Sequence, residues 1–60
     1  MYKINLLENE ITITSKEVLE YEDVLKEVDK LIYILNKNKK IIVYNKKDNN
    51  WIKFGEWKMQ

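Results

Sequence analysis

The spacing of the apolar residues changes twice along this 60-residue chain, and each change limits the fold that the chain can adopt. Apolar and polar side chains alternate in YKINL, residues 2–6, and in ITIT, residues 11–14. A period of two is typical of β-strands that bury one face. The segment ENE, residues 8–10, suits the short loop of a hairpin. The sequence therefore predicts two antiparallel strands at the N-terminal end.

In the middle of the chain the apolar residues recur at steps of three and four, the period of an α-helix with one buried face. This stripe consists of Val18, Tyr21, Leu25, Val28, Ile32 and Leu35. Thr14 and Glu17 have the spacing of a capping box, while Ile13 and Val18 have that of a hydrophobic staple. We therefore predict a long helix over residues 15–36. The alternative is a shorter helix that begins near Glu22 and is capped by Asp23, with residues 14–20 extended.

Beyond the helix the pattern again favours strands. KKIIVYNK is rich in β-branched and aromatic residues, KDNN is a turn sequence, and WIKFGEWKM reads as a further strand in which Gly55 marks a bulge. The order ββαββ predicts an α+β fold: one sheet of about four strands with a single helix packed on one face. Residues 1–60 are expected to form one domain.

The composition limits the function. The chain has no His, no Cys and only one Gly, so it lacks the groups that titrate near neutral pH, a Cys/His metal site and a Gly-rich phosphate loop. We therefore expect neither an enzyme nor a cofactor or metal site. Without a long apolar run or a signal sequence, we expect a soluble, cytoplasmic protein with no membrane partner.

The two tryptophans allow two interpretations. In one, Trp57 lies beyond a bulge at Gly55 and packs at the edge of the core. In the other, Tyr44, Trp51 and Trp57 form an aromatic patch on the face of the sheet that the helix leaves uncovered. A buried aromatic side chain removes roughly 150–250 Å² from water, which favours the first interpretation for a domain this small.

The charges are unevenly distributed. Residues 1–36 contain four lysines and eight acidic residues, whereas residues 37–60 contain seven lysines and two acidic residues. Every basic residue is Lys, and Ile, Asn and Lys fill 26 of the 60 positions, a bias typical of AT-rich coding. We therefore expect a small protein-binding inhibitor encoded by a phage or mobile element, of an anti-defence type such as an anti-CRISPR. Its acidic helix would mimic nucleic acid and occupy a basic cleft of a host protein such as a nuclease. The residues predicted to bind this partner are Glu20, Asp23, Glu27, Leu19 and Ile34.

Two other functions are considered. The basic C-terminal hairpin would suit a nucleic-acid-binding module in which lysines bind phosphates and aromatic rings stack on bases. The residues predicted for this alternative are Tyr44, Lys46, Lys47, Trp51, Lys53 and Trp57. A structural accessory protein that assembles with itself is the third reading. A homodimer is expected in any case, with the open sheet face or an edge strand as its interface.

Overall fold

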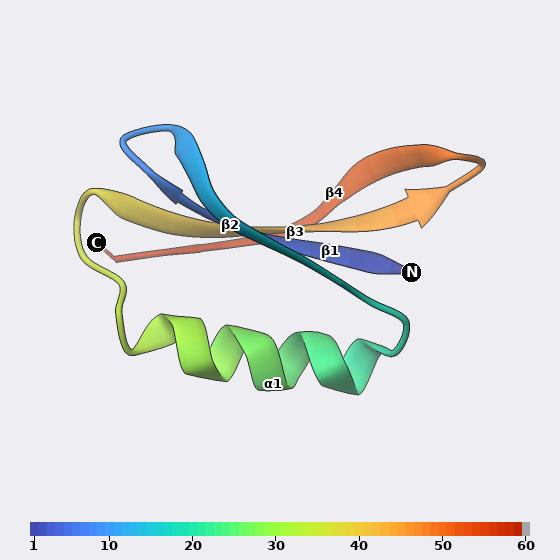
Figure 1. The fold of residues 1–60 in the computed structure, drawn as a ribbon, viewed down its shortest axis with the longest axis horizontal. Helices are drawn as coiled ribbons and strands as arrows, with labels where there is room; N and C mark the ends of the chain where they lie inside the picture. The colour runs from blue at the N-terminus through green and yellow to red at the C-terminus, as the bar shows by residue number, and fades with distance from the viewer. Residues whose placement is uncertain (60) are drawn as a thin grey trace.

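The computed structural model describes residues 1–59, which form two β-hairpins joined by one helix (Figure 1). The elements are β1 (Tyr2–Glu8), β2 (Ile11–Val18), α1 (Tyr21–Ile32), β3 (Lys39–Lys47) and β4 (Asn50–Lys58). The predicted ββαββ order and α+β class are confirmed. The helix α1 is too short and too polar to span a membrane, and it is the one helix among residues 1–59.

The four strands form one antiparallel sheet in the order β2-β1-β3-β4. Each hairpin closes with a two-residue loop, Asn9-Glu10 or Asp48-Asn49, and all four loop residues have φ between 51° and 69°. Two successive positive φ angles are the signature of a type I′ turn, whose twist matches that of the flanking strands. The central pair, β1 with β3, joins the two hairpins, so residues some 40 positions apart become neighbours: Lys3 lies opposite Tyr44.

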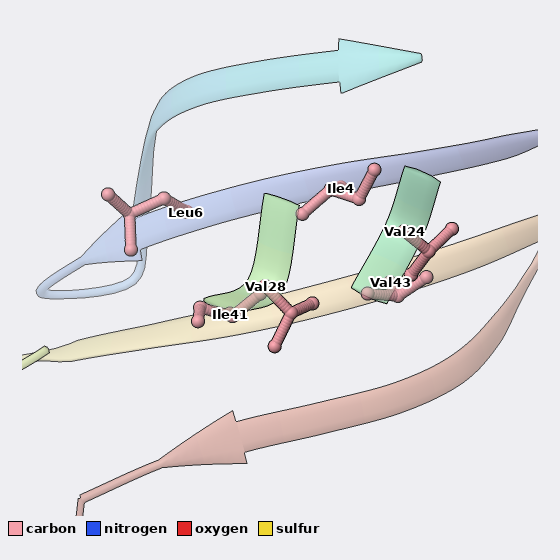
Figure 2. Packing of buried hydrophobic residues seen from close by; sticks show 6 residues of the cluster. All are labelled: Ile4, Leu6, Val24, Val28, Ile41 and Val43. Atoms are coloured by element: carbon pink, nitrogen blue, oxygen red, sulfur yellow. The ribbon is translucent and has the colours of Figure 1, made fainter. Parts of the chain in front are cut away.

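The core lies between α1 and the two central strands (Figure 2). It consists of six aliphatic residues: Ile4 and Leu6 from β1, Ile41 and Val43 from β3, and Val24 and Val28 from α1. The first four alternate along their strands, as the period of two predicts. Below the sheet in Figure 1, α1 packs mainly on β1, β2 and β3 and leaves the other face without a covering element.

The long-helix prediction is wrong. Residues 14–18 belong to β2, where they pair with β1 from Leu6 to Tyr2. The helix begins at Tyr21, close to the start at Glu22 in the shorter alternative, but it ends at Ile32 and not at the predicted residue 36. Its N-cap is Glu20, not Asp23, and the Glu20 side chain makes no capping hydrogen bond. The capping-box and staple patterns therefore have no helical role here; a continuous ladder with β1 outweighs these local signals.

The predicted bulge near Gly55 is present. The pairing of β3 with β4 shifts between Val43, opposite Gly55, and Tyr44, opposite Lys53, so that Phe54 is the extra residue of β4. Gly55 and Trp57 consequently lie on the same face as the buried Ile41 and Val43, and Trp57 packs against the core. The first interpretation of Trp57 is confirmed. The three-residue aromatic patch is wrong for Trp57, because the bulge reverses the alternation of β4.

Candidate nucleic-acid interface on the open face of the sheet

The face of the sheet that α1 does not cover, called here the open face, is basic and partly aromatic. Cross-strand neighbours share a face, and the register places Lys3, Tyr44 and Lys53 in one row across three strands. Lys46 lies opposite Trp51 in the next row. The charged and aromatic residues of the open face on β1, β3 and β4 are Lys3, Lys40, Tyr44, Lys46, Trp51, Lys53, Glu56 and Lys58.

Trp51 lies among lysine side chains on this face. The Lys3 Nζ atom is 4.5 Å from the centre of the Trp51 ring, and the Lys46 Nζ atom is 5.5 Å from it. Lys3 also lies 5.6 Å from the ring centre of Tyr44. These distances are those of cation–π contacts. The half-buried indole is therefore flanked by positive charge supplied by two strands that are far apart in sequence.

One carboxylate, that of Glu56, partly neutralises the positive charge of this face. Glu56 pairs with Lys53, which is three residues away in sequence but next to it on the open face because of the bulge, and it lies 4.0 Å from Lys58. The hydrogen bond from Lys53 holds the pKa of Glu56 below its ordinary value, with smaller contributions from the positive charges of Lys53, Lys40 and Lys58. Glu56 is thus ionised at neutral pH, and its negative charge holds Lys53 and Lys58 close together on the open face.

A second ion pair connects the open face to the first hairpin loop. Lys40 Nζ donates a hydrogen bond to Glu10 Oε2 at 2.9 Å, and this bond raises the pKa of Lys40. On the β1–β2 side, Ser15 donates to the side chain of Asn5 at 2.6 Å, in agreement with their opposite positions in the ladder. The polar groups at this end of the face are therefore partnered within the protein.

The structure divides the residues predicted for nucleic-acid binding. Tyr44, Lys46, Trp51 and Lys53 lie together on the open face. Lys47 follows Val43 and Asn45 in the alternation of β3 and therefore points to the helix side, where Trp57 also lies. Sequence reasoning missed Lys3, Lys40 and Lys58. The alternation of β1 places the side chains of Lys3 and Ile4 on different faces of the sheet, but only the pairing of β1 with β3 places Lys3 beside Trp51.

The residues predicted for the acidic helix do not form one surface. Leu19 precedes α1 and Ile34 follows it, so the helix separates these two exposed side chains. Glu27 turns towards β2: its carboxylate lies 3.2 Å from Lys16 and 3.9 Å from Lys30. Glu20 is exposed at the N-cap, and Asp23 is half-buried in the first turn. The helix is thus less acidic towards solvent than its sequence suggests.

The described part of the chain contains no group of three or more His, Cys, Asp or Glu side chains placed to hold a metal ion. A groove of about 530 Å³ lies between the end of α1 and β4, lined by Ile32, Leu35, Glu56, Trp57 and Lys58.

Comparison of the chain with protein-family models, with curated proteins and with solved structures finds no match.

Proposed function

We propose that this protein binds single-stranded nucleic acid on the open face of its sheet. The observation that carries the proposal is the placement of Lys3 and Lys46 beside the ring of Trp51 on a face that no helix covers. Proteins that bind single strands without sequence preference combine a basic surface with aromatic rings on which bases stack. Here both components occur within two adjacent rows of one sheet.

The energetics are compatible with exchange of the lysines for a base. A cation–π contact at an exposed site contributes about 0.5–1 kcal/mol, whereas a base stacked on an aromatic side chain contributes about 1–3 kcal/mol. A base can therefore replace the ammonium group of Lys3 over Trp51. The displaced ammonium groups remain next to the ring, where they can contact the phosphates on either side of that base.

The chemistry of the face favours weak sequence preference. The chain has no Arg, the residue that most often reads guanine through two hydrogen bonds. Lysine binds phosphate as a point charge, and stacking tolerates any base. Binding should therefore depend strongly on salt and only slightly on sequence.

The test compares two variants with the same net charge. Lys3→Gln/Lys46→Gln removes the two cations beside Trp51, and Lys26→Gln/Lys30→Gln removes two exposed cations from α1. Affinity for labelled single-stranded DNA and RNA is measured by fluorescence anisotropy over a range of salt concentrations. For the first variant we expect weaker binding and a salt slope shallower by roughly 1.4, since each phosphate contact to a single strand contributes about 0.7. The helix variant should behave as the parent protein.

A second measurement tests stacking directly. The variant Trp57→Phe leaves Trp51 as the sole tryptophan, and Trp51→Phe leaves Trp57. A base stacked on the open face should quench the fluorescence of Trp51 and leave that of Trp57, which packs on the core side, unchanged. No binding to any single strand at low salt, or equal quenching of both rings, would contradict the proposal.

A protein-binding inhibitor of the anti-defence type is the second candidate. It is favoured by Glu20, Glu22 and Asp29, which are exposed and make no ion pair among the described residues. If the protein binds no nucleic acid, the variant Glu22→Gln/Asp29→Asn becomes the informative one. Loss of binding to a partner isolated from the native host, with the Lys3→Gln/Lys46→Gln variant unaffected, would favour α1 as the functional surface.

A further inference from the structure

Strand β4 is an edge of the sheet that α1 leaves largely uncovered. It lies outermost, beside β3, whereas α1 packs mainly on the other three strands. On the helix side of β4, Ile52 is 51% exposed and Phe54 is 48% exposed. The Phe54 ring packs against the rings of Tyr2 and Tyr21, whereas the groove lined by Ile32 and Trp57 lies at the other end of α1. An edge with unpaired backbone groups and exposed apolar side chains is a site at which another strand can add.

The outward-facing backbone groups of β4 can be assigned from the ladder. In an antiparallel pair, the N–H and C=O groups of alternate residues point towards the partner strand. Lys46 donates its N–H to Met1 O at 2.9 Å, so its backbone faces β1 and not β4. Trp51, opposite Lys46, therefore has its own backbone groups turned away from β3. Continuing the alternation through the bulge gives four outward-facing residues: Trp51, Lys53, Glu56 and Lys58.

The spacing of these four residues is palindromic. They are separated by two, three and two positions, the middle interval being longer because of the bulge at Phe54. An antiparallel copy of β4 can therefore align all four residues with all four of their counterparts in one register. In that register Lys53 lies opposite Glu56 of the second copy, and Trp51 lies opposite Lys58 of the second copy. Each of these complementary pairs occurs twice.

We infer that β4 pairs with β4 of a second copy of this chain in that register, and forms a two-fold symmetric dimer with one continuous sheet. Opposite charges directly across an antiparallel pair stabilise it, and like charges destabilise it. The register thus satisfies the backbone groups and the charges together. The lysines and the bulge, which discourage pairing with most strands, permit pairing with this one.

The helix side of the same register is apolar. Ile52 lies opposite Trp57 of the second copy, and Phe54 lies opposite Gly55 of the second copy, so the two bulges meet at the two-fold axis. Pairing would remove exposed parts of Ile52 and Phe54 from water. Two open faces would then lie side by side and double the basic surface, although the dimer does not depend on what that surface binds.

The other edge strand lacks these properties. Asn9 donates its N–H to Asn38 O at 2.9 Å, so odd-numbered residues of β1 face β3, and the outward-facing residues of β2 are Thr12, Ser15 and Glu17. Their spacing of three and two is not palindromic, and they include no cation. A symmetric pairing of β2 with itself therefore aligns fewer backbone groups and gains no charge pair.

The test uses two charge-reversed variants, alone and mixed. In Lys53→Glu the symmetric pairing opposes glutamate to glutamate, and in Glu56→Lys it opposes lysine to lysine. Sedimentation equilibrium without nucleic acid should show a dimer for the parent protein. Each variant alone should have a dimer dissociation constant raised on the order of tenfold or more, because two attractive pairs become repulsive. An equimolar mixture should form a one-to-one heterodimer, because each variant supplies the charge that the other lacks.

The mixture distinguishes pairing between chains from the contact of Lys53 with Glu56 within one chain, which mixing cannot restore. Glu22→Lys on α1 is the matched control and should dimerise as the parent does. Circular dichroism of each variant verifies that it is folded. A parent protein that remains monomeric at high micromolar concentration would overturn the inference. So would single variants that dimerise like the parent, or a mixture that contains no heterodimer. None of these results bears on single-strand binding through Lys3 and Lys46.

Discussion

Replacement of Gly55 by alanine tests the account of the bulge and of Trp57, because two physical effects predict opposite signs. A glycine in an ordinary strand position is unfavourable, and Gly→Ala at a compatible site stabilises a protein by about 0.4–1 kcal/mol through the unfolded state. At Gly55, however, an added Cβ would lie 3.1 Å from Cη2 and 3.2 Å from Cζ3 of Trp57. These atoms belong to a rigid ring that packs against the core, so the ring must move by a few tenths of an ångström.

Overpacking of this kind costs about 1–3 kcal/mol, which outweighs the gain from the unfolded state. We therefore expect Gly55→Ala to lower the free energy of unfolding by about 1–2 kcal/mol, and to lower the melting temperature by roughly 4–8 °C for each kcal/mol. The change is measured by urea unfolding at a fixed protein concentration, with circular dichroism as the signal.

The matched experiment places the same change in a Trp57→Leu background. Without the indole ring the added methyl group meets no rigid neighbour, so Gly55→Ala should there be neutral or stabilising. If Gly55→Ala stabilises the parent protein, or costs the same in both backgrounds, then the close approach of Trp57 to Gly55 does not explain the glycine.

Three further predictions concern the turn, the helix start and the pH dependence. Asn49→Gly should raise the free energy of unfolding by up to about 1 kcal/mol, because residue 49 has φ of 66° and glycine adopts this conformation without strain. Thermal unfolding measures the change. The control is Asn50→Gly, which should destabilise β4. Glu20→Asp should raise the free energy of unfolding by about 0.5–1 kcal/mol, because the Glu20 side chain makes no capping hydrogen bond and an aspartate is short enough to make one. An unchanged midpoint of urea unfolding would contradict this prediction. The pKa of Glu56 is lowered in the folded protein, so its contribution to stability is present above the ordinary value of 4.5 and is lost as the pH falls through the lower folded pKa. Between pH 6 and pH 3, the free energy of unfolding measured with urea should therefore fall less in Glu56→Gln than in the parent protein, and an equal fall in both would contradict this prediction.

Much of the fold could be predicted from the sequence because the relevant signals are local. Alternation in residues 2–6 identifies Ile4 and Leu6 as core residues, since a strand turns successive side chains to opposite faces whatever its neighbours are. The Asp48-Asn49 turn follows from residue types that tolerate positive φ. The expectation of a bulge at Gly55 likewise depends on a single residue, because glycine in a strand leaves room for close packing or a change of register.

The start of the helix and the composition of the open face were decided by tertiary structure. Residues 14–18 carry the capping-box signal of a helix, and hydrogen bonding to β1, which is absent from the isolated segment, selects the strand. Glu27 is acidic in the sequence, but the position of Lys16 on β2 gives it a partner in the fold. Lys3 joins Trp51 only because β1 and β3 are neighbours in the sheet, an order that no local pattern specifies. Residue types and their spacing determined the elements, whereas the face on which each charge lies depended on strand order and on one bulge, because both arise from contacts between distant parts of the chain.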